Sequence, residues 1–314
     1  MFRRSGYRFA DKIMRHLKFY SYCRCRHQPQ PIRLVLSILM AFAILLCVSK
    51  TSRAWTMTGH SAVIEIGTRH LSEKAAGQIR NLLDRDPIEL ADLAMWADDI
   101  AEERPETDPW HAVDIPHNGA GYNRERDCKS DDCIVQKIEE FARVLADMHA
   151  AKPVRAEALK FLIHFVGDLH VPLHAYAPGP PEDVWDGWGG WEGPWIRIGD
   201  KVAQLHTWWD WKFVADLGSS SSEIAARLAA EITAEERMAW ERSSSEDWAN
   251  ESFQIAREFV MRHGLIDRDR LEGNSETNPI VLDVAVLEEA NRIAARRLKM
   301  AGVRLARLLN RAFE

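Results

Sequence analysis

The chain has 314 residues, of which 46% are hydrophobic and 28% charged, proportions that exclude collagen-like, coiled-coil and wholly disordered proteins. Its formal net charge of −6 is unevenly spread, because residues 1–54 hold 11 Lys and Arg but one acidic residue, Asp11. The remaining residues carry 30 basic and 46 acidic side chains, so a basic leader precedes an acidic body.

The basic leader has the parts of a secretory signal peptide. A basic stretch ends at Arg33, an apolar run covers 34–48, and the small residues Ser52 and Ala54 precede a cleavage point before Trp55. The run is short for a bilayer span of roughly 20 residues, and an uncleaved anchor is the alternative. We therefore predict a signal peptide with a long basic n-region over 1–54 and an exported domain, periplasmic or secreted, over 55–314.

Beyond the leader, apolar residues recur at spacings of three and four, and alternating runs are scarce, which predicts helices. Asp86 and Pro87 supply a cap and a first-turn proline for a helix that includes Leu90 and Ile100. Other helices are expected at 58–70, 72–83, 133–150, 156–169, 205–215, 220–231, 233–262 and 280–313. Loops are expected at 114–127, 177–201 and 264–278, and the second of these contains four Trp. No repeat or change of composition marks a second domain, so we expect a single compact all-α domain with long loops around the functional site.

Only two cysteines, Cys128 and Cys133, follow the leader. Because cysteines of exported proteins are commonly paired, we predict one disulfide that closes a small loop; two free thiols are the alternative. A zinc site built from them is not expected, since no second pair completes four ligands.

A metal-ligand pattern lies in the apolar helix expected at 156–169. His164 and Asp168 are four residues apart, so both point from one helix face toward the same place. A buried carboxylate and imidazole need a partner, and a metal ion is one; a core histidine bonded to an aspartate is the alternative. Pro172 ends this helix, so His174 is free to face a different point.

The same spacing returns at His206 and Asp210, on another expected helix. Further nitrogen and oxygen ligands lie near tryptophans or near the expected new amino terminus: Asp98, His111, Asp114 and His60. With no sulfur among them, these ligands suit zinc, and their number requires more than one metal site.

Together these motifs resemble the zinc-dependent single-strand nuclease family of the S1/P1 type. The resemblance runs from Trp55 to the final helix, where Ala301-Gly-Val-Arg-Leu305 is also similar. It rests on Trp55-x3-Gly59-His60, Trp96-Ala-Asp98, Trp110-His111-x2-Asp114, His164-x3-Asp168-x5-His174 and Leu205-His206-x3-Asp210.

The resemblance implies three zinc ions per chain, with Asp168 bridging two of them. The first would be held by Asp98, His111, His164 and Asp168, the second by the amino nitrogen and carbonyl oxygen of Trp55 with His60 and Asp168, and the third by His174, His206 and Asp210.

The resemblance also implies the reaction: hydrolysis of single-stranded DNA and RNA to 5′-phosphorylated products, with activity on 3′-nucleotides. Asp98 would orient the nucleophile and Asp114 would contact the base. The positive charge of three zinc ions would offset the negative charge of the acidic body at the place where phosphate binds. The implied protein is a monomer with no stable protein partner and no membrane contact after the leader is removed.

The chain departs from the family pattern at three places. Ala112 replaces an aromatic residue that stacks a base, and Ala101 replaces a basic residue near phosphate, for which Arg104 is a substitute. Trp191 stands where the family often has Asn, and with Trp188 it could supply new stacking surfaces or pack the loop.

Two other functions compete with the nuclease. A zinc phospholipase C shares the amino-terminal Trp and the ligand order, and a non-enzymatic secreted helical binding protein could have structural zinc or none. The context of Asp98 and the presence of Asp210 favour the nuclease.

Overall fold

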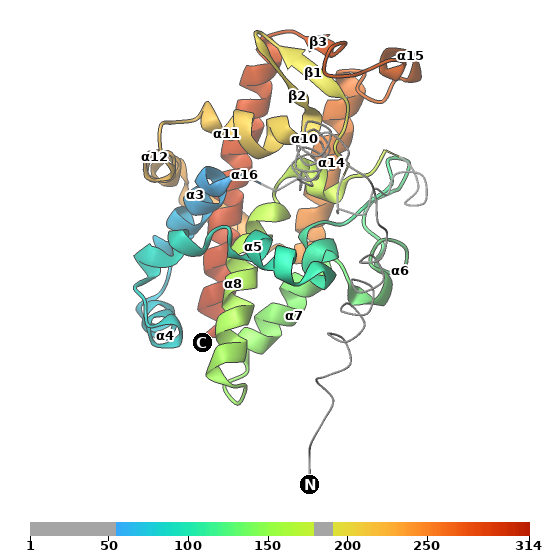
Figure 1. Cartoon of the computed structure of the whole chain (residues 1–314). Coiled ribbons are helices and arrows are strands. Elements are labelled where there is room, and N and C mark those ends of the chain that lie inside the picture. The colour runs from blue at the N-terminus through green and yellow to red at the C-terminus, as the bar shows by residue number, and fades with distance from the viewer. Residues whose placement is uncertain (1–54, 179–190) are drawn as a thin grey trace, which may run out of the picture. The chain divides into compact units, whose positions relative to one another are not determined.

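The computed structural model describes residues 55–178 and 191–314 (Figure 1). The predicted signal peptide and residues 179–190 of the Trp-rich loop lie outside this part of the chain. The amino-terminal half contains α3 (Met57–Thr68), α4 (Glu73–Leu83), α5 (Trp96–Glu103), α6 (Arg124–Asp127), α7 (Ile134–Ala146) and α8 (Lys152–Asp168), with 3-10 turns at Pro87–Leu93, Pro105–His111, Lys129–Asp131 and Pro172–Ala175.

The carboxyl-terminal half is also mostly helical. It contains α10 (Leu205–Thr207), a π-helical turn (Trp208–Lys212), α11 (Phe213–Ala215), α12 (Ser221–Glu231), α13 (Ala234–Trp240), α14 (Ser245–Arg262), α15 (Arg268–Leu271) and α16 (Ala285–Ala312). The expectation of a mostly helical protein is confirmed. Among the described residues, no helix is long and apolar enough to cross a bilayer.

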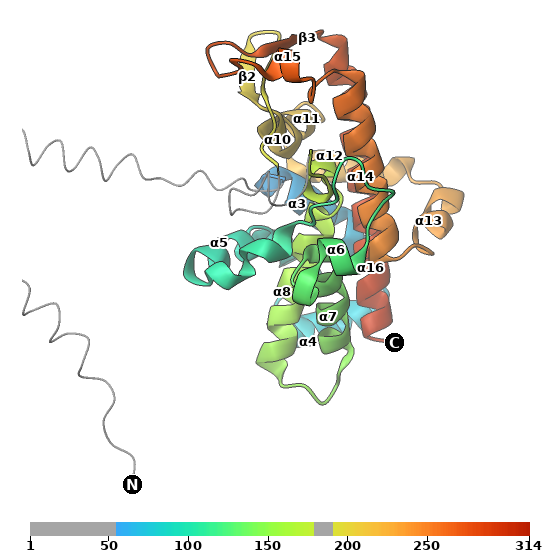
Figure 2. The ribbon, with the colours of Figure 1, turned by 90° about the vertical axis from the view of Figure 1, so that its right-hand side faces the viewer.

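A small sheet is the main departure from the expected all-α fold. β1 (Trp195–Ile198) pairs antiparallel with β2 (Lys201–Gln204) and parallel with β3 (Ile280–Leu282), in the order β2-β1-β3. The final helix therefore begins at Ala285, not at 280. Figures 1 and 2 place this sheet at one end of the described part of the chain and α4 with the carboxyl terminus at the other.

The single helix expected at 233–262 is wrong, because the chain forms α13 and α14 with a break between them. Each helix starts with a capping box, in which Thr233 pairs with Glu236 and Ser244 pairs with Asp247. A Ser or Thr side chain bonded to the third helical N–H satisfies orphan backbone donors, so Ser244 starts a new helix.

The described residues share one large hydrophobic core that extends from Trp55 to Phe313. The long helix α16 crosses α3 closely at Gly302, where a Cβ atom would lie 2.4 Å from Ile66 Cγ2 and 3.1 Å from the Val63 carbonyl oxygen. Glycine is therefore required at this crossing. The close approach fixes α3, and with it His60, against the core.

The predicted disulfide is confirmed. Cys128 and Cys133 are bonded, with their Cα atoms 5.3 Å apart, and both residues are 3% exposed. The bond closes the loop of residues 129–132 immediately before α7.

Candidate metal centre

The carboxyl-terminal turn of α8 carries the central pair of the site. His164 and Asp168 are both fully buried, and His164 Nε2 lies 3.2 Å from Asp168 Oδ2. The other ring nitrogen of His164, Nδ1, donates to the Ala94 carbonyl oxygen at 2.7 Å. Because this hydrogen bond fixes the tautomer, the lone pair of Nε2 points toward the carboxylates.

Helix α3 brings His60 to the same carboxylate. Its Nε2 lies 3.2 Å from Asp168 Oδ1, and its ring stacks on that of His164 with centroids 4.1 Å apart. The ring fits here because Gly167 has no side chain: a Cβ atom at that position would lie 2.6 Å from His60 Nδ1.

Two further donors come from α5, which carries Asp98, and from the end of the following 3-10 turn, which carries His111. His111 Nδ1 lies 3.0 Å from Asp168 Oδ2 and 3.6 Å from Asp98 Oδ1, and Asp98 Oδ1 is 3.4 Å from His164 Nε2. Asp168 thus lies within 3.2 Å of nitrogens from three histidines. Asp168 is thus the carboxylate on which the histidines of this group converge. We call Asp98, His111, His164, Asp168 and His60 the paired group.

A separate group, which we call the third group, forms beyond the end of α8. His174 and His206 have ring centroids 4.9 Å apart, and His206 Nε2 lies 3.5 Å from Asp210 Oδ1. His174 Nδ1 donates to the His111 carbonyl oxygen at 2.7 Å, and His206 Nδ1 donates to that of Trp191 at 3.0 Å. As in His164, both Nε2 atoms are left to act as ligands.

The donor atoms of both groups fit metal ions. The His/Asp sets His60–His164–Asp168, Asp98–His111–His164 and His174–His206–Asp210 each have ligand atoms within 4.8 Å of one another. Buried atoms without a hydrogen-bond partner include His60 Nε2, Asp98 Oδ2, His164 Nε2, Asp168 Oδ1, His174 Nε2, His206 Nε2 and Asp210 Oδ1. Buried polar atoms rarely lack a hydrogen-bond partner, so these groups of donor atoms could each bind a metal ion.

The paired group is internally charged. Burial by itself lowers the pKa of His164, but Asp168 and Asp98 outweigh burial and raise that pKa well above its ordinary value. Burial opposes ionisation of Asp168, yet the pKa of this carboxyl is held well below its usual range, chiefly by His164 and also by His111 and His60. A metal ion bound here would replace the proton of His164 as the partner of both carboxylates.

The third group favours neutral side chains. Burial lowers the pKa of His174 and of His206 to about 4 each. Burial also raises the pKa of Asp210 well above its ordinary value, with further contributions from Glu192, Asp168 and Asp98. The two imidazoles are therefore unprotonated at neutral pH and ready to donate lone pairs.

Trp55 packs beside both groups. It is fully buried, and its ring meets that of His60 edge-on with centroids 6.5 Å apart. The next residue, Thr56, donates its backbone N–H to the Asp210 carbonyl oxygen at 2.9 Å. The start of the described chain is thus attached to the segment that carries Asp210.

The two residues expected to contact substrate lie in different surroundings. Asp114 is half-buried in a segment bonded to the chain around His174, through Val113 N–H to the His174 carbonyl oxygen at 2.8 Å. Arg104 instead pairs with Glu157 at 2.7 Å and Glu106 at 3.2 Å, and hydrogen bonding to Glu157 raises its pKa. A phosphate would have to compete with both carboxylates for this guanidinium.

Two of the residues that depart from the family pattern, Ala112 and Trp191, are buried or partly buried. Ala112 is 4% exposed. Trp191 is partly buried against the core, and its ring lies 5.4 Å from that of Tyr176. Trp188 lies outside the described residues. These contacts of Trp191 favour packing of the loop over stacking on a substrate base.

A buried cluster of charged residues behind α8 was not predicted from the sequence. Arg297 donates to the His170 carbonyl oxygen at 3.1 Å, and Ser252 donates to that of Leu169 at 2.5 Å. Arg304 lies 2.8 Å from His170 Nε2 and pairs with Glu251 at 2.7 Å. The cluster holds the turn between Asp168 and His174. Two residues of the cluster lay in motifs that the sequence singled out: Arg304 in Ala301-Gly-Val-Arg-Leu305, and His170 between Asp168 and His174.

A mostly helical protein with buried nitrogen and oxygen donors in adjacent groups has the features of a multi-metal hydrolase, a class that includes phosphatases and nucleases. The model of the S1/P1 nuclease family matches residues 55–314. The chain belongs to the S1/P1 nuclease family, and it is accordingly a hydrolase that acts on phosphodiester bonds.

Individual relatives agree with this assignment. Endonuclease 2 of Arabidopsis thaliana is 27% identical over 294 residues, which cover 86% of this chain and 94% of that protein. Nuclease P1 of Penicillium citrinum is 32% identical over 133 residues, covering 40% of this chain and 49% of that protein. Nuclease S1 of Aspergillus oryzae is 25% identical over 216 residues, covering 67% of this chain and 72% of that protein.

Proposed function

We propose that this nuclease is a zinc enzyme that hydrolyses single-stranded DNA and RNA to 5′-phosphorylated products and also acts on 3′-nucleotides. The observation that carries the metal dependence is the convergence of unpaired buried donor atoms in the paired and third groups. The absence of sulfur among these donors favours zinc bound by nitrogen and oxygen.

Three zinc ions per chain are proposed. Asp98, His111, His164 and Asp168 would hold the first; Trp55, His60 and Asp168 the second; and His174, His206 and Asp210 the third. Bound zinc lowers the pKa of water and neutralises charge that develops on a phosphate.

The protein's own residues prepare this reaction. Asp98 Oδ2 is buried and has no hydrogen-bond partner, so it is available to accept a proton from the attacking water and orient it. Asp114 is proposed to bond the edge of the substrate base, and Arg104 to contact phosphate. The hydrogen bonds of His164, His174 and His206 to backbone carbonyls hold the three imidazoles in fixed orientations before substrate arrives.

The second site requires a free amino terminus at Trp55. We propose that residues 1–54 are a signal peptide, that cleavage releases the Trp55 amine, and that the 55–314 domain works as an exported monomer. The burial of Trp55 and the bond from Thr56 to Asp210 support this placement, because they keep the new terminus beside the donors.

A substrate panel tests the proposal. Purified 55–314 protein would be assayed on single-stranded DNA, single-stranded RNA, double-stranded DNA, a 3′-nucleotide and a choline phospholipid, with and without a chelator. Chelator-sensitive hydrolysis of single strands and the 3′-nucleotide is expected, together with close to three zinc ions by elemental analysis. Full activity of a metal-free protein, or preference for the phospholipid, would contradict the proposal.

A further inference from the structure

The disulfide loop touches the chain on both sides of His111. On one side, Trp110 Nε1 donates a hydrogen bond to Asp132 Oδ1, and Asp132 is the last residue of the loop. On the other side, the N–H of Ile134, which follows Cys133, donates to the Ala112 carbonyl oxygen at 3.1 Å. The two chain neighbours of His111 are therefore both fastened to residues adjacent to Cys133.

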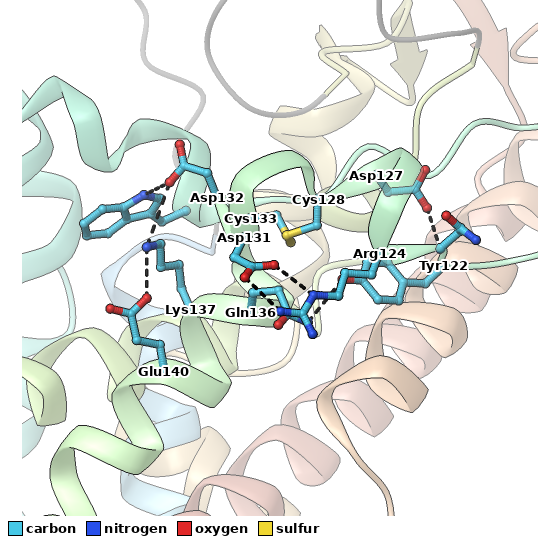
Figure 3. Close-up of a disulfide and its surroundings, with 12 residues drawn as sticks. Tyr122, Arg124, Asp127, Cys128, Asp131, Asp132, Cys133, Gln136, Lys137 and Glu140 are labelled. Carbon is cyan, nitrogen blue, oxygen red and sulfur yellow. Dashed lines mark hydrogen bonds and ion pairs between the residues drawn. A yellow bond between two sulfur atoms is a disulfide. The ribbon is translucent and has the colours of Figure 1, made fainter.

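A cation strengthens the contact at Trp110. Lys137 Nζ, in the first turn of α7, lies 4.4 Å from the centre of the Trp110 ring. The same nitrogen pairs with Glu140 Oε2, one turn further along the helix, at 3.0 Å (Figure 3). Cation–π contacts of this kind add attraction to hydrogen bonding at the same ring. Trp110 is thus held at its indole nitrogen and at its ring face.

The fastened segment serves both metal groups. His111 Nδ1 lies 3.0 Å from Asp168 Oδ2 in the paired group. The carbonyl oxygen of the same residue accepts the Nδ1–H of His174 in the third group at 2.7 Å. A shift of residues 110–112 would therefore move one ligand directly and release the orienting bond of another.

The loop conformation depends on its closure. Ser130 and Asp131 have φ angles of 61° and 59°, a left-handed conformation that residues other than glycine seldom adopt. Such backbone persists only where the surrounding structure enforces it. Cys128 and Cys133 are buried in the core at the two ends of the loop, and their bond provides that constraint.

We propose that the Cys128–Cys133 loop is a positioning element of the metal centre, which holds His111 in its ligand orientation through Asp132 and Ile134. The inference rests on the proposed metal-binding function. Asp132 and Trp110 act here as positioning residues, because they reach the metal donors only through His111.

The test measures zinc affinity by chelator competition, together with kcat and KM, in the 55–314 protein. Asp132→Ala should weaken the most loosely held zinc about 10–100-fold, the range for loss of a group that orients a metal ligand. Asp132→Asn keeps an acceptor oxygen and should restore most of the affinity. Trp110→Phe should match Asp132→Ala, and the double variant should be no worse than either single one.

The matched control is Arg124→Ala. Arg124 pairs with Asp131 of the same loop at 2.8 Å, and within the described part of the chain no hydrogen bond or ion pair joins it to residues 110–112, so zinc affinity should stay at the wild-type value. Equal affinity of Asp132→Ala and the wild type would overturn the proposal, and so would an equal loss in Arg124→Ala.

Reduction tests the disulfide itself. A thiol reductant should weaken zinc binding of the wild type and leave the Cys128→Ser/Cys133→Ser variant, already weakened, unchanged. If that variant does not fold, the zinc affinities of the Asp132 and Trp110 variants still test the positioning role of the loop. Absence of zinc from the wild type would refute the proposed function, whereas normal zinc binding unaffected by every loop variant would refute only this inference.

Discussion

The paired group and the third group use the same residue types in opposite electrostatic states. The paired group has two carboxylates among three histidines, and its His164 and Asp168 form an ion pair at 3.2 Å. The third group has one carboxyl group, Asp210, whose pKa is raised by burial, and burial keeps His174 and His206 neutral. The paired group is thus partly organised by its own charges, whereas the third group would acquire a cation only from a bound metal ion.

The two groups also differ in how the chain builds them. Donors of the paired group come from α3, α5, the 3-10 turn Pro105–His111 and α8, so they converge only after these segments pack together. Donors of the third group lie between His174 and Asp210, and two of them are on consecutive turns of one short helical segment. A substitution in the paired group should therefore disturb more segments of the chain than a substitution in the third group.

The largest contrast is expected between Asp168→Ala and His206→Ala. Loss of Asp168 removes a neighbour of three histidine nitrogens, and should cost two zinc ions and more than about 100-fold in kcat, since even groups that only orient ligands are worth 10–100-fold. His206→Ala should cost one zinc ion. Zinc content and kcat of both variants, with exposed Asp99→Ala as control, check the contrast; equal zinc loss would refute the bridging role.

Acid should act differently on the two groups in the metal-free protein. Folded His174 and His206 have a pKa of about 4 against 6.5 when unfolded, so the unfolded chain binds more protons between these values. Their contribution to the free energy of unfolding is present above pH 6.5 and falls by on the order of 3 kcal/mol per histidine as the pH drops to 4. His164, with its raised pKa, contributes stability below pH 6.5 that is lost as the pH rises.

Urea unfolding of chelated protein at pH 8.5, 7, 5.5 and 4.5 measures this dependence. His206→Gln should reduce the loss of stability as the pH falls below 6.5, and His164→Gln should reduce the loss as the pH rises above 6.5. The opposite assignment would mean that the two groups do not differ in protonation as described.

Extension of the amino terminus should damage the paired group alone. One residue retained before Trp55 converts its amine to an amide, which cannot donate a lone pair to a metal. We expect the loss of one zinc ion and a fall in kcat of more than about tenfold, the lower bound for groups that orient ligands, with the His174–His206–Asp210 site still filled. Equal zinc content and kcat in the native and extended proteins, with the extension confirmed by mass spectrometry, would remove Trp55 from the ligand set.

The smallest effect is expected at Arg104, outside both groups. Because its guanidinium already pairs with Glu106 and Glu157 and is about a third exposed, a phosphate contact there should be weak. Arg104→Ala should raise KM for single-stranded DNA by about 1.5–5-fold, the equivalent of a surface ion pair of 0.2–1 kcal/mol, and leave zinc content unchanged. An unchanged KM would show that Arg104 does not touch substrate.

Local patterns predicted most helices but not their interruptions. The spacing of apolar residues gave α3, α4, α7, α8 and α12 with ends a few residues different. It joined α13 to α14, although Ser244 and Asp247 form a capping box that short-range inspection could have found. The spacing of apolar residues also placed Ile280–Leu282 in a helix. These residues form a strand only by pairing with β1, some 80 residues earlier in the chain, which no local pattern shows.

The sequence by itself determined the types of donor and their local directions. His164 with Asp168, and His206 with Asp210, lie four residues apart, so helix geometry alone turns each pair to one side. The two cysteines likewise predicted their bond, because they are the only two after the leader and cysteines of exported proteins are commonly paired.

Only the tertiary structure decided which donors meet. The approach of α3 at Gly302 and Gly167 brings His60 to Asp168, and the packing of residues 110–112 against the disulfide loop places His111 between the two groups. Buried Arg297 and Arg304 hold the turn between the two groups, and no periodic pattern of apolar residues marks these arginines as buried. Helix periodicity is a property of neighbouring residues, whereas the meeting of distant donors depends on packing shape and on the burial of charge, which no local pattern contains.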